Sequence, residues 1–272
     1  MSPTLAQVNF RKKSIHMSKV QVFDSMTEFL SFRQTFSPDV EIGFVPTMGA
    51  LHQGHVSLLN RSIDENDFTV LSIFVNPTQF NDPTDFTKYP KTWDADMVLA
   101  TAAGVNAIIA PTYNQLYPDN YRYKIIEGEF SKKLCGAERI GHFDGVLTVV
   151  MKLLQIVRPH KAYFGEKDYQ QFKLIHDMVQ SFFMPIQVVP CPTLREASGL
   201  AMSSRNTRLS AEGLKKAALI YQFISEEKTT VQAAQKLTDH GFQVEYLQDE
   251  GDRRFVAAFL EGVRLIDNVT IK

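Results

Sequence analysis

Short apolar runs alternate with amphipathic segments along most of the chain. Strand-like apolar runs cover residues 20–23, 42–45, 69–75, 107–110, 162–164 and 186–189. Apolar residues recur at helical spacing over 26–36, 56–63, 93–103, 146–157 and 165–182, and residues 121–130 are expected to be extended. Near-continuous apolar strands are typical of a sheet that is buried on both faces. Because strands alternate with helices, the pattern predicts an α/β fold with a doubly wound parallel sheet.

The pattern changes after Pro192. A polar stretch over 195–209 precedes a helical pattern over 211–226, then a second polar stretch and apolar segments at 244–247 and 253–271. We therefore expect residues 18–192 to form the parallel-sheet domain and residues 193–272 to form a smaller C-terminal α+β domain. Residues 1–17 are polar and lack the apolar segment of a secretion signal, so we expect them to be a flexible extension.

Composition limits the classes of protein that need to be considered. The chain has 272 residues, is 44% hydrophobic and 22% charged, and carries a formal net charge of −1. This charge gives no general attraction to nucleic acid or to an anionic membrane, and no apolar run is long enough to span a bilayer. Cys135 and Cys191 form no spaced pair, which favours a reducing compartment, so we expect a cytoplasmic protein.

Two histidines lie where a predicted strand turns into a predicted helix. The strand at 42–45 ends in a turn that contains Gly49, and His52-Gln53-Gly54-His55 follows immediately before the helical pattern. A helix N-terminus presents unpaired N–H groups and a positive dipole end, which suit phosphate. Gly49 and Gly54 would let an anion approach the backbone. The imidazoles of His52 and His55 could donate hydrogen bonds to phosphate as charge builds up, so the motif indicates nucleotide chemistry.

Two other interpretations of the histidine pair remain open at this point. His52 and His55 could form half of a zinc site, although no cysteine or further histidine cluster lies close in sequence to complete four ligands. They could also simply cap the helix. Taken alone, the motif does not separate a helix cap from a phosphate site.

Three predicted loops follow the carboxyl ends of predicted strands. They cover residues 46–55, 76–82 and 165–171. In doubly wound sheets, ligands bind beyond the carboxyl ends of the strands, near the point where the strand order switches. We therefore expect these loops to share one cleft.

Four motifs occur together in an order that is similar to one known family. They are Pro-Thr-Met-Gly-Ala-Leu-His-Gln-Gly-His at 46–55, Phe-Val-Asn-Pro-Thr-Gln-Phe at 74–80, Phe-Gly-Glu-Lys-Asp-Tyr-Gln-Gln at 164–171 and Met-Ser-Ser-Arg-Asn at 202–206. Over residues 18–272 the chain resembles the pantothenate synthetase family of the HxGH nucleotidyltransferase superfamily. The resemblance implies a Rossmann-like sheet domain with a small C-terminal lid domain.

The resemblance also implies a two-step ligase that serves pantothenate and coenzyme A biosynthesis. Pantoate would attack ATP to give pantoyl adenylate and pyrophosphate, and β-alanine would then release pantothenate and AMP. Mg²⁺ would accompany the triphosphate. The implied partners are these small molecules and a second copy of the chain in a homodimer, with no nucleic acid and no membrane.

The site residues follow from matching the family motifs position by position. The resemblance gives the catalytic role to His55, with His52 beside it and Lys167 as a point charge on phosphate. Gln79 and Gln171 would hold pantoate oxygens, because amides offer both donors and acceptors. The ATP contacts implied are Met48, Gly49, His52, His55, Gly165, Glu166, Lys167, Asp168, Leu194, Met202, Ser203, Ser204 and Arg205; Met48 would also line the pantoate pocket, Asp168 would accept ribose hydroxyls, and metal ligands are not assigned.

Two other classes of function compete with the ligase. One is a nucleotidyltransferase that keeps the adenylyl group in its product; Gln79 and Gln171, suited to a small hydroxy acid, disfavour it. The other is a non-catalytic nucleotide-binding module, which the retention of both histidines, Lys167 and Arg205 disfavours.

Overall fold

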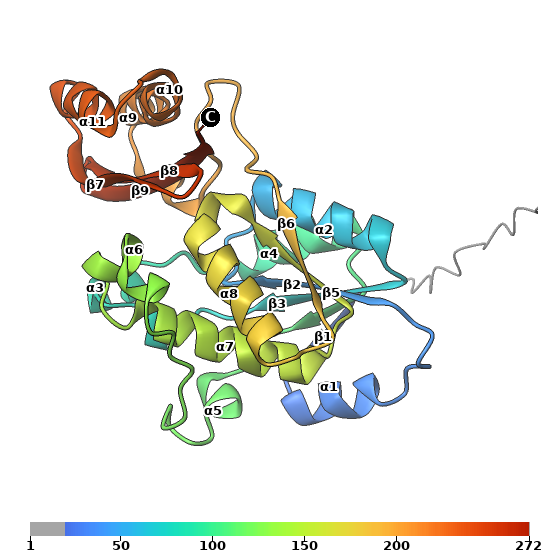
Figure 1. The fold of residues 1–272 in the computed structure, drawn as a ribbon. Helices are drawn as coiled ribbons and strands as arrows, with labels where there is room; N and C mark the ends of the chain where they lie inside the picture. Colours follow the sequence, from blue (N-terminus) through green and yellow to red (C-terminus); the bar gives the residue numbers. More distant parts are fainter. Residues whose placement is uncertain (1–19, 272) are drawn as a thin grey trace, which may run out of the picture.

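The larger of two sheets is parallel throughout, as the sequence predicts. The computed structural model describes residues 20–271. The larger sheet has the spatial order β1-β4-β3-β2-β5-β6 (Figure 1). Its strands are β1 (Gln21–Phe23), β2 (Ile42–Thr47), β3 (Phe68–Ile73), β4 (Ala107–Ile109), β5 (Lys161–Gly165) and β6 (Gln187–Cys191). The expected extension at 1–17 lies outside the described residues.

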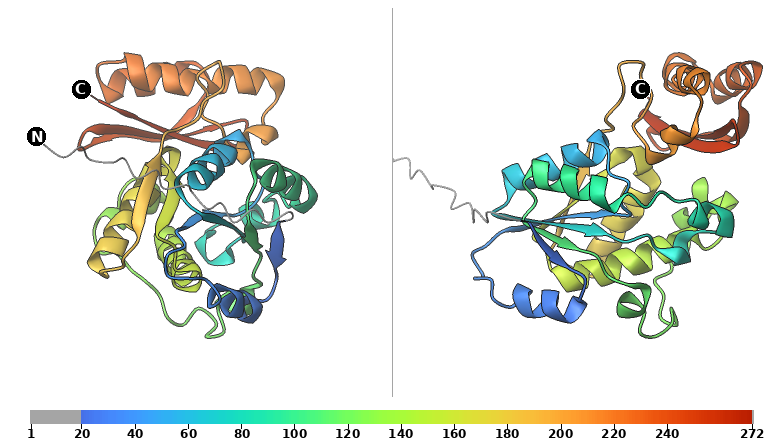
Figure 2. Two further views of the ribbon diagram at one scale, coloured as in Figure 1. Left: turned by 90° about the vertical axis from the view of Figure 1, so that its right-hand side faces the viewer. Right: turned by 180° about the vertical axis from the view of Figure 1, so that it is seen from behind.

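Helices cover both faces of this sheet, so the sheet is doubly wound (Figures 1 and 2). One face packs against α2 (Gln53–Glu65) and α4 (Trp93–Ala103), around a core that includes Leu59 and Leu71. The other face packs against α1 (Met26–Arg33), α7 (His142–Val157) and α8 (Tyr169–Ser181), around a larger core that includes Phe44 and Leu147. Burial on both faces explains the near-continuous apolar strands.

One expected extended segment forms no strand in the described chain. Residues 121–129 are irregular, and Phe130 begins the short helix η2 (Phe130–Lys132), which follows α5 (Tyr113–Leu116) along the chain. Side chains take backbone donors of this segment: the N–H of Tyr123 donates to Asp119, and the N–H of Ile125 donates to Thr148. A backbone whose donors are used in this way cannot pair as a strand. Within residues 20–271, no helix combines the length and apolarity needed to cross a bilayer.

A second, antiparallel sheet forms near the C-terminus, as the expected smaller α+β unit. It contains β7 (Gln243–Glu250), β8 (Arg253–Leu260) and β9 (Val263–Thr270), with β8 in the centre. Phe255 and Ala257 of β8 belong to the large core, whereas Val256 and Ala258 belong to a separate core beneath three helices. Alternate side chains of β8 therefore join the sheet to the parallel domain on one face and to its own helices on the other. The proposed boundary near residue 192 stays a prediction.

Two helix predictions for the C-terminal region were inaccurate. The segment expected as one helix over 211–226 is two helices, α9 (Ala211–Ala217) and α10 (Leu219–Glu226). The helix α11 (Thr230–Asp239) lies in the second polar stretch, where the sequence predicts no helix, because only Ala233 and Leu237 of it are buried. A single buried turn gives a weak periodic signal.

The strand order places a switch point between β2 and β5. Strand β2 pairs with β3 on one side and with β5 on the other, and the chain then continues outward in opposite directions. The carboxyl ends there are Thr47 and Gly165, which begin two of the predicted site loops. The antiparallel sheet lies over this end of the parallel sheet (Figure 2).

Candidate active site

A pocket of about 230 Å³ opens at the switch point, lined by residues from both sheets' domains. Most of the predicted site residues line it: Met48, His52, His55, Gln79, Gly165, Lys167, Asp168, Gln171, Leu194, Met202, Ser203, Ser204 and Arg205. Two predicted ATP contacts are not in its wall, because Gly49 packs against Asp96 and the carboxylate of Glu166 binds Arg253. A second cavity of about 450 Å³ adjoins it, and Lys167, Asp168, Ser203 and Arg205 line both. The expectation of one shared cleft is confirmed.

The two histidines cap helix α2 with their own side chains. His52 is the N-cap residue, and its Nδ1 accepts a hydrogen bond from the N–H of Gly54 at 3.1 Å. Nδ1 of His55 accepts in turn from the N–H of His52 at 3.3 Å. The helix-cap interpretation of the motif is therefore correct, and it is compatible with a phosphate site. Because each Nδ1 is an acceptor, a neutral ring carries its proton on Nε2, which remains as a donor for a ligand.

We expect unpaired backbone N–H groups at this helix N-terminus to bind an anion, but side chains already accept several of these N–H groups. The N–H of Gly49 donates to Thr47 Oγ1, and the N–H groups of His52 and Gly54 donate to the imidazoles. A Cβ on Gly54 would lie 2.8 Å from the ring of His52. Gly54 is therefore required to seat the imidazole. Imidazole Nε2–H groups, rather than these amides, are the donors that the motif offers to phosphate.

Both imidazoles are uncharged at neutral pH. Burial, with the nearby charge of Lys167, lowers the pKa of His52 to about 4. Burial, with His52 and Lys167 adding to it, lowers the pKa of His55 to about 3. Positive charge in the pocket therefore comes from Lys167, whose Nζ lies 3.8 Å from Asp168 Oδ2, and from Arg205. The neutral histidines are suited to donating hydrogen bonds rather than to attracting anions at a distance.

The side-chain amide of Gln79 has a fixed orientation. Asn76, which is 1% exposed, donates from Nδ2 to Gln79 Oε1 at 3.1 Å. The Nε2 group of Gln79 therefore points the other way, and it lies 3.2 Å from Met48 Sδ in the pocket. The main-chain oxygen of Gln79 contacts His142 Nδ1 at 2.7 Å and accepts from Arg139 Nη2 at 3.2 Å. This arrangement presents an N–H donor to a ligand.

Sequence analysis missed three residues that support Gln79. Asn76 precedes Pro77 in the second motif and caps the short helix η1 (Pro77–Gln79). His142 is the first residue of α7, and Arg139 lies three residues before it. The Gly-His pair before a strongly amphipathic helix was the available signal. Burial lowers the pKa of His142 to about 3, with the charge of Arg139 adding to it.

Of the two adjacent glutamines in α8, only the second lines the pocket. Gln170 is buried, accepts the N–H of Cys135 and donates to the carbonyl oxygens of Phe130 and Lys133. Gln170 therefore fixes a loop of the parallel domain. Gln171 is in the pocket wall, as the resemblance implied.

The Ser-Ser-Arg segment forms the start of a short helix. Ser203 caps the helix η4 (Ser204–Arg208) by accepting the N–H of Arg205 at 3.2 Å. The segment lies in the polar stretch over 195–209, but Leu200 and Leu209 on either side of it are buried in the C-terminal core. Arg205 Nη2 lies 3.1 Å from Asp85 Oδ2, in helix α3 (Pro83–Thr87) of the parallel domain.

The loop that carries Lys167 is fastened to the antiparallel sheet. Asn268 of β9 donates from Nδ2 to the carbonyl oxygens of Glu166 and Lys167, at 2.9 and 3.0 Å. Arg253 of β8 pairs with Glu166 at 2.7 Å and stacks 3.7 Å from the ring centroid of Tyr169. The C-terminal sheet thus contributes to the position of Lys167 without touching the pocket through these side chains.

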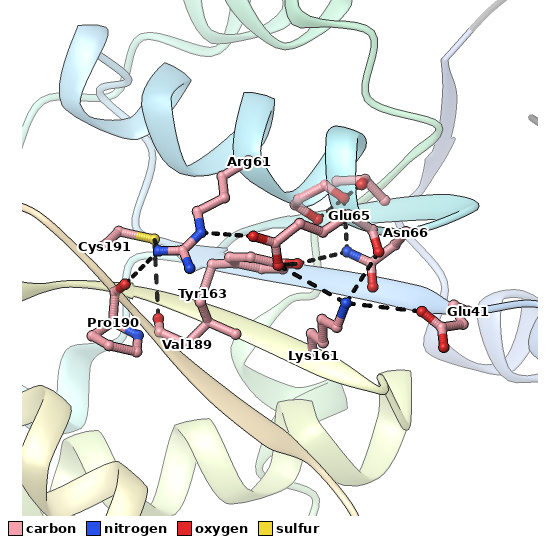
Figure 3. A network of polar contacts seen from close by, with 11 residues as sticks. Glu41, Arg61, Glu65, Asn66, Lys161, Tyr163, Val189, Pro190 and Cys191 are labelled. Atoms are coloured by element: carbon pink, nitrogen blue, oxygen red, sulfur yellow. Dashed lines mark hydrogen bonds and ion pairs between the residues drawn. The ribbon is translucent and has the colours of Figure 1, made fainter. Parts of the chain in front are cut away.

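A polar network fixes the far end of α2 (Figure 3). Arg61 donates to Glu65 Oε1 at 2.9 Å and to the carbonyl oxygen of Pro190 at 2.6 Å. The hydroxyl of Tyr163 donates to Glu65 at 3.0 Å and accepts from Asn66 at 2.7 Å. Tyr163 belongs to β5 and lines the pocket. The helix that begins with the two histidines is therefore tied at its other end to β5 and β6.

The fold and the pocket together define a class of protein, an α/β nucleotide-binding enzyme of the HxGH type. The model of the pantoate-beta-alanine ligase family matches residues 20–270 of the chain. The chain belongs to the pantoate–β-alanine ligase family.

Individual relatives agree with the family model. Pantothenate synthetases from Bdellovibrio bacteriovorus and Legionella pneumophila are 58% and 47% identical over 251 and 249 residues, which is 92% of this chain and 99% of each relative. A crystal structure of pantoate-beta-alanine ligase from Francisella tularensis, complexed with beta-gamma ATP and β-alanine, has a TM-score of 0.89 at 40% identity and covers 93% of this chain and 98% of its own. Pantothenate synthetase from Thermus thermophilus has a TM-score of 0.83 at 36% identity, covering 92% and 99%.

Proposed function

We propose that the chain condenses pantoate with β-alanine to form pantothenate, using ATP and passing through pantoyl adenylate. The observation that carries this proposal is the composition of one pocket. It combines two neutral imidazoles, a lysine and an arginine with two amides and an apolar wall. The cationic and imidazole groups suit a triphosphate, and the amides suit the oxygens of a small hydroxy acid.

In the first step, a carboxylate oxygen of pantoate attacks the α-phosphorus of ATP. The bond between the α-phosphorus and its bridging oxygen breaks, and pyrophosphate leaves. Gln79 and Gln171 would hold pantoate, with Phe74, Val146 and Val150 beside its methyl groups. His52 and His55 would donate from Nε2 to the α-phosphate oxygens as charge develops there, and positioning contributes more than proton transfer.

The remaining pocket residues would hold the nucleotide. Lys167 and Arg205 would neutralise charge on the phosphates, and Ser203 and Ser204 would donate hydrogen bonds to them. Lys167 and Arg205 line both adjoining cavities. Gly165 and Leu194 would contact the nucleoside, and Asp168 would accept ribose hydroxyls.

In the second step, the uncharged amine of β-alanine attacks the carbonyl carbon of the adenylate. The bond from that carbon to the phosphate oxygen breaks, AMP leaves and the nitrogen loses a proton. Exclusion of water from the pocket protects the adenylate until the amine arrives.

Magnesium is expected to accompany ATP. Within residues 20–271, no group of three or more His, Cys, Asp or Glu side chains is arranged to hold a metal ion. Mg²⁺ commonly keeps several waters and is bound largely by substrate phosphates. The residues present therefore fit an ion held by phosphate oxygens and water, which would lower the charge on the triphosphate.

A homodimer and a cytoplasmic location are part of the same proposal. The family resemblance supports the dimer, and sedimentation velocity of the purified chain tests it. Cys135 and Cys191 are both unpaired and buried, which supports a reducing compartment.

The experiment that tests the function measures which products depend on which substrates. The ligase predicts AMP release that requires ATP, pantoate and β-alanine together, and pyrophosphate release that requires only ATP and pantoate. A nucleotidyltransferase would instead leave the adenylyl group in its final product. ATP binding with no pyrophosphate release in the presence of pantoate would indicate a non-catalytic module.

A further inference from the structure

A buried carboxylate lies beneath the loop that enters the histidine helix. Asp96, in the first turn of α4, is 2% exposed. Its Oδ2 accepts the N–H of Ala50 at 3.0 Å, and its Oδ1 accepts the N–H of Leu51 at 2.8 Å. The hydroxyl of Thr92 also donates to Oδ1, at 3.1 Å. Both oxygens of Asp96 therefore bind this loop, and Asp96 is not part of the pocket wall.

The loop that Asp96 holds has an unfavourable backbone conformation. Gly49 and Ala50 both have positive φ angles, of 81° and 50°. The left-handed region is unfavourable for a residue with a Cβ, so Ala50 needs a compensating interaction. A Cβ at residue 49 would lie 2.9 Å from Asp96 Oδ2, so the carboxylate can approach only because that residue is glycine. Two charge-assisted hydrogen bonds from consecutive amides supply the compensation.

The N-cap residue of α2 follows this loop directly in the sequence. Leu51, whose N–H Asp96 accepts, is followed by His52, the N-cap residue. The position of His52 Nδ1 beneath the N–H of Gly54 therefore depends on the path that the loop takes. No other described side chain accepts the N–H groups of Ala50 and Leu51.

We propose that Asp96 is a positioning residue for the adenylylation step, and this rests on the function proposed above. Its carboxylate holds residues 50 and 51 in the one path that places the imidazole of His52 over the helix start. Because the N–H of His52 donates to Nδ1 of His55, the same path also fixes the orientation of the His55 ring. A misplacement of about 1 Å in groups that act on a transition state can lower a rate about 100-fold.

The test compares two aspartates in the same helical turn. Asp96→Asn removes the charge and one acceptor oxygen, whereas Asp94→Asn makes the same change at an exposed position. We expect Asp96→Asn to lower the kcat of pantoate-dependent ATP–pyrophosphate exchange about 10- to 100-fold, with the KM for pantoate changed less than about threefold. Asp94→Asn should retain the wild-type kcat.

Two further readouts separate positioning from a general structural role. Long-range ¹H–¹⁵N spectra should show both imidazoles as Nε2–H tautomers in the wild type and a changed tautomer signal for His52 in Asp96→Asn. Glycine adopts the left-handed conformation without strain, so adding Ala50→Gly to Asp96→Asn should recover several-fold of the lost kcat. If Asp96→Asn lowered kcat only by destabilising α4, adding Ala50→Gly would not restore kcat.

Each outcome decides the proposal. A folded Asp96→Asn variant with wild-type exchange and wild-type imidazole spectra overturns it, as does a reduced rate that Ala50→Gly leaves unchanged. If Asp96→Asn is recovered unfolded, Thr92→Val takes its place, since it removes only the third hydrogen bond to Asp96. A Thr92→Val exchange rate equal to the wild type then overturns it. Absence of exchange in the wild type would instead contradict the proposed function.

Discussion

The main-chain N–H of His52 donates to Nδ1 of His55 at 3.3 Å, and the two imidazole centroids lie 4.1 Å apart. One nitrogen of each ring is thereby committed to the helix start. The other nitrogen is left as a donor for a ligand. In the proposed function the same two side chains both cap the helix and act on phosphate, and substitution can separate these two effects.

Replacing His55 by Asn should separate the cap from the chemistry. The amide oxygen of Asn can take the place of Nδ1 and accept the His52 N–H, but nothing replaces the Nε2–H donor. We expect adenylate formation to fall about 10²- to 10⁴-fold, as for His55→Ala, while the free energy of unfolding changes less than in His55→Ala. Single-turnover pyrophosphate release and urea denaturation measure the two effects. Near-normal release by folded His55→Asn would remove His55 from the mechanism.

Substitution of the pocket amides should impair pantoate use selectively. Gln79→Ala and Gln171→Ala each remove a side chain that lines the pocket, so each should weaken pantoate use by about 1–3 kcal/mol. ATP binding should stay close to that of the wild type. Gln180→Ala, an exposed change in the same helix as Gln171, is the control. Calorimetry showing lost ATP affinity with normal pantoate use would reverse the assignment of the pocket.

Arg205 should determine how well the adenylate is sealed from water. In the structure Asp85 holds both Arg205 and Arg208, at 3.1 and 3.2 Å, and only Arg205 also lines the smaller pocket. We expect Arg205→Ala to slow adenylate formation and to release more AMP than pantothenate at saturating β-alanine. Arg208→Ala, which loses the same partner, should keep the two products equal. Equal products from Arg205→Ala would show that this segment does not seal the intermediate.

The low pKa values of the histidines predict the pH dependence. Because His52 and His55 have pKa values of about 4 and about 3, neither should produce an inflection near pH 6.5 in the rate profile. The unfolded chain binds protons at these residues near pH 6.5 and the folded chain does not, so stability is greatest above that pH and falls as pH decreases. Between about pH 7 and about pH 5, His55→Asn should lose about 1–2 kcal/mol less unfolding free energy than the wild type. An imidazole ¹³C titration with a midpoint near 6.5 would contradict this.

The sequence predicted those features that depend on local pattern. Alternating strands and helices predicted the parallel sheet, and the turn before His52 predicted the helix start. The loops at 46–55, 76–82 and 165–171 share the pocket because parallel strands end at the same edge. The roles assigned to their residues remain predictions.

Two of the contacts that were not predicted join residues far apart in the sequence. Asp96 binds Ala50 and Leu51, which lie 46 and 45 residues away in the sequence. Asp85 binds Arg205, which lies 120 residues away. No local pattern encodes such pairs. The segment at 121–130 has a strand-like composition, but Asp119 and Thr148 take backbone donors that a strand would need.

In the proposed reaction, a carboxylate oxygen of pantoate becomes bonded to the α-phosphorus of ATP. Pantoate labelled with ¹⁸O in its carboxylate tests this most directly when it is converted with ATP and β-alanine, and the AMP is examined by mass spectrometry. The proposed mechanism predicts that each AMP formed carries one labelled oxygen, because the amine displaces AMP together with that oxygen. Unlabelled AMP, or label found in inorganic phosphate alongside ADP, would contradict the pantoyl adenylate and the function proposed for the pocket.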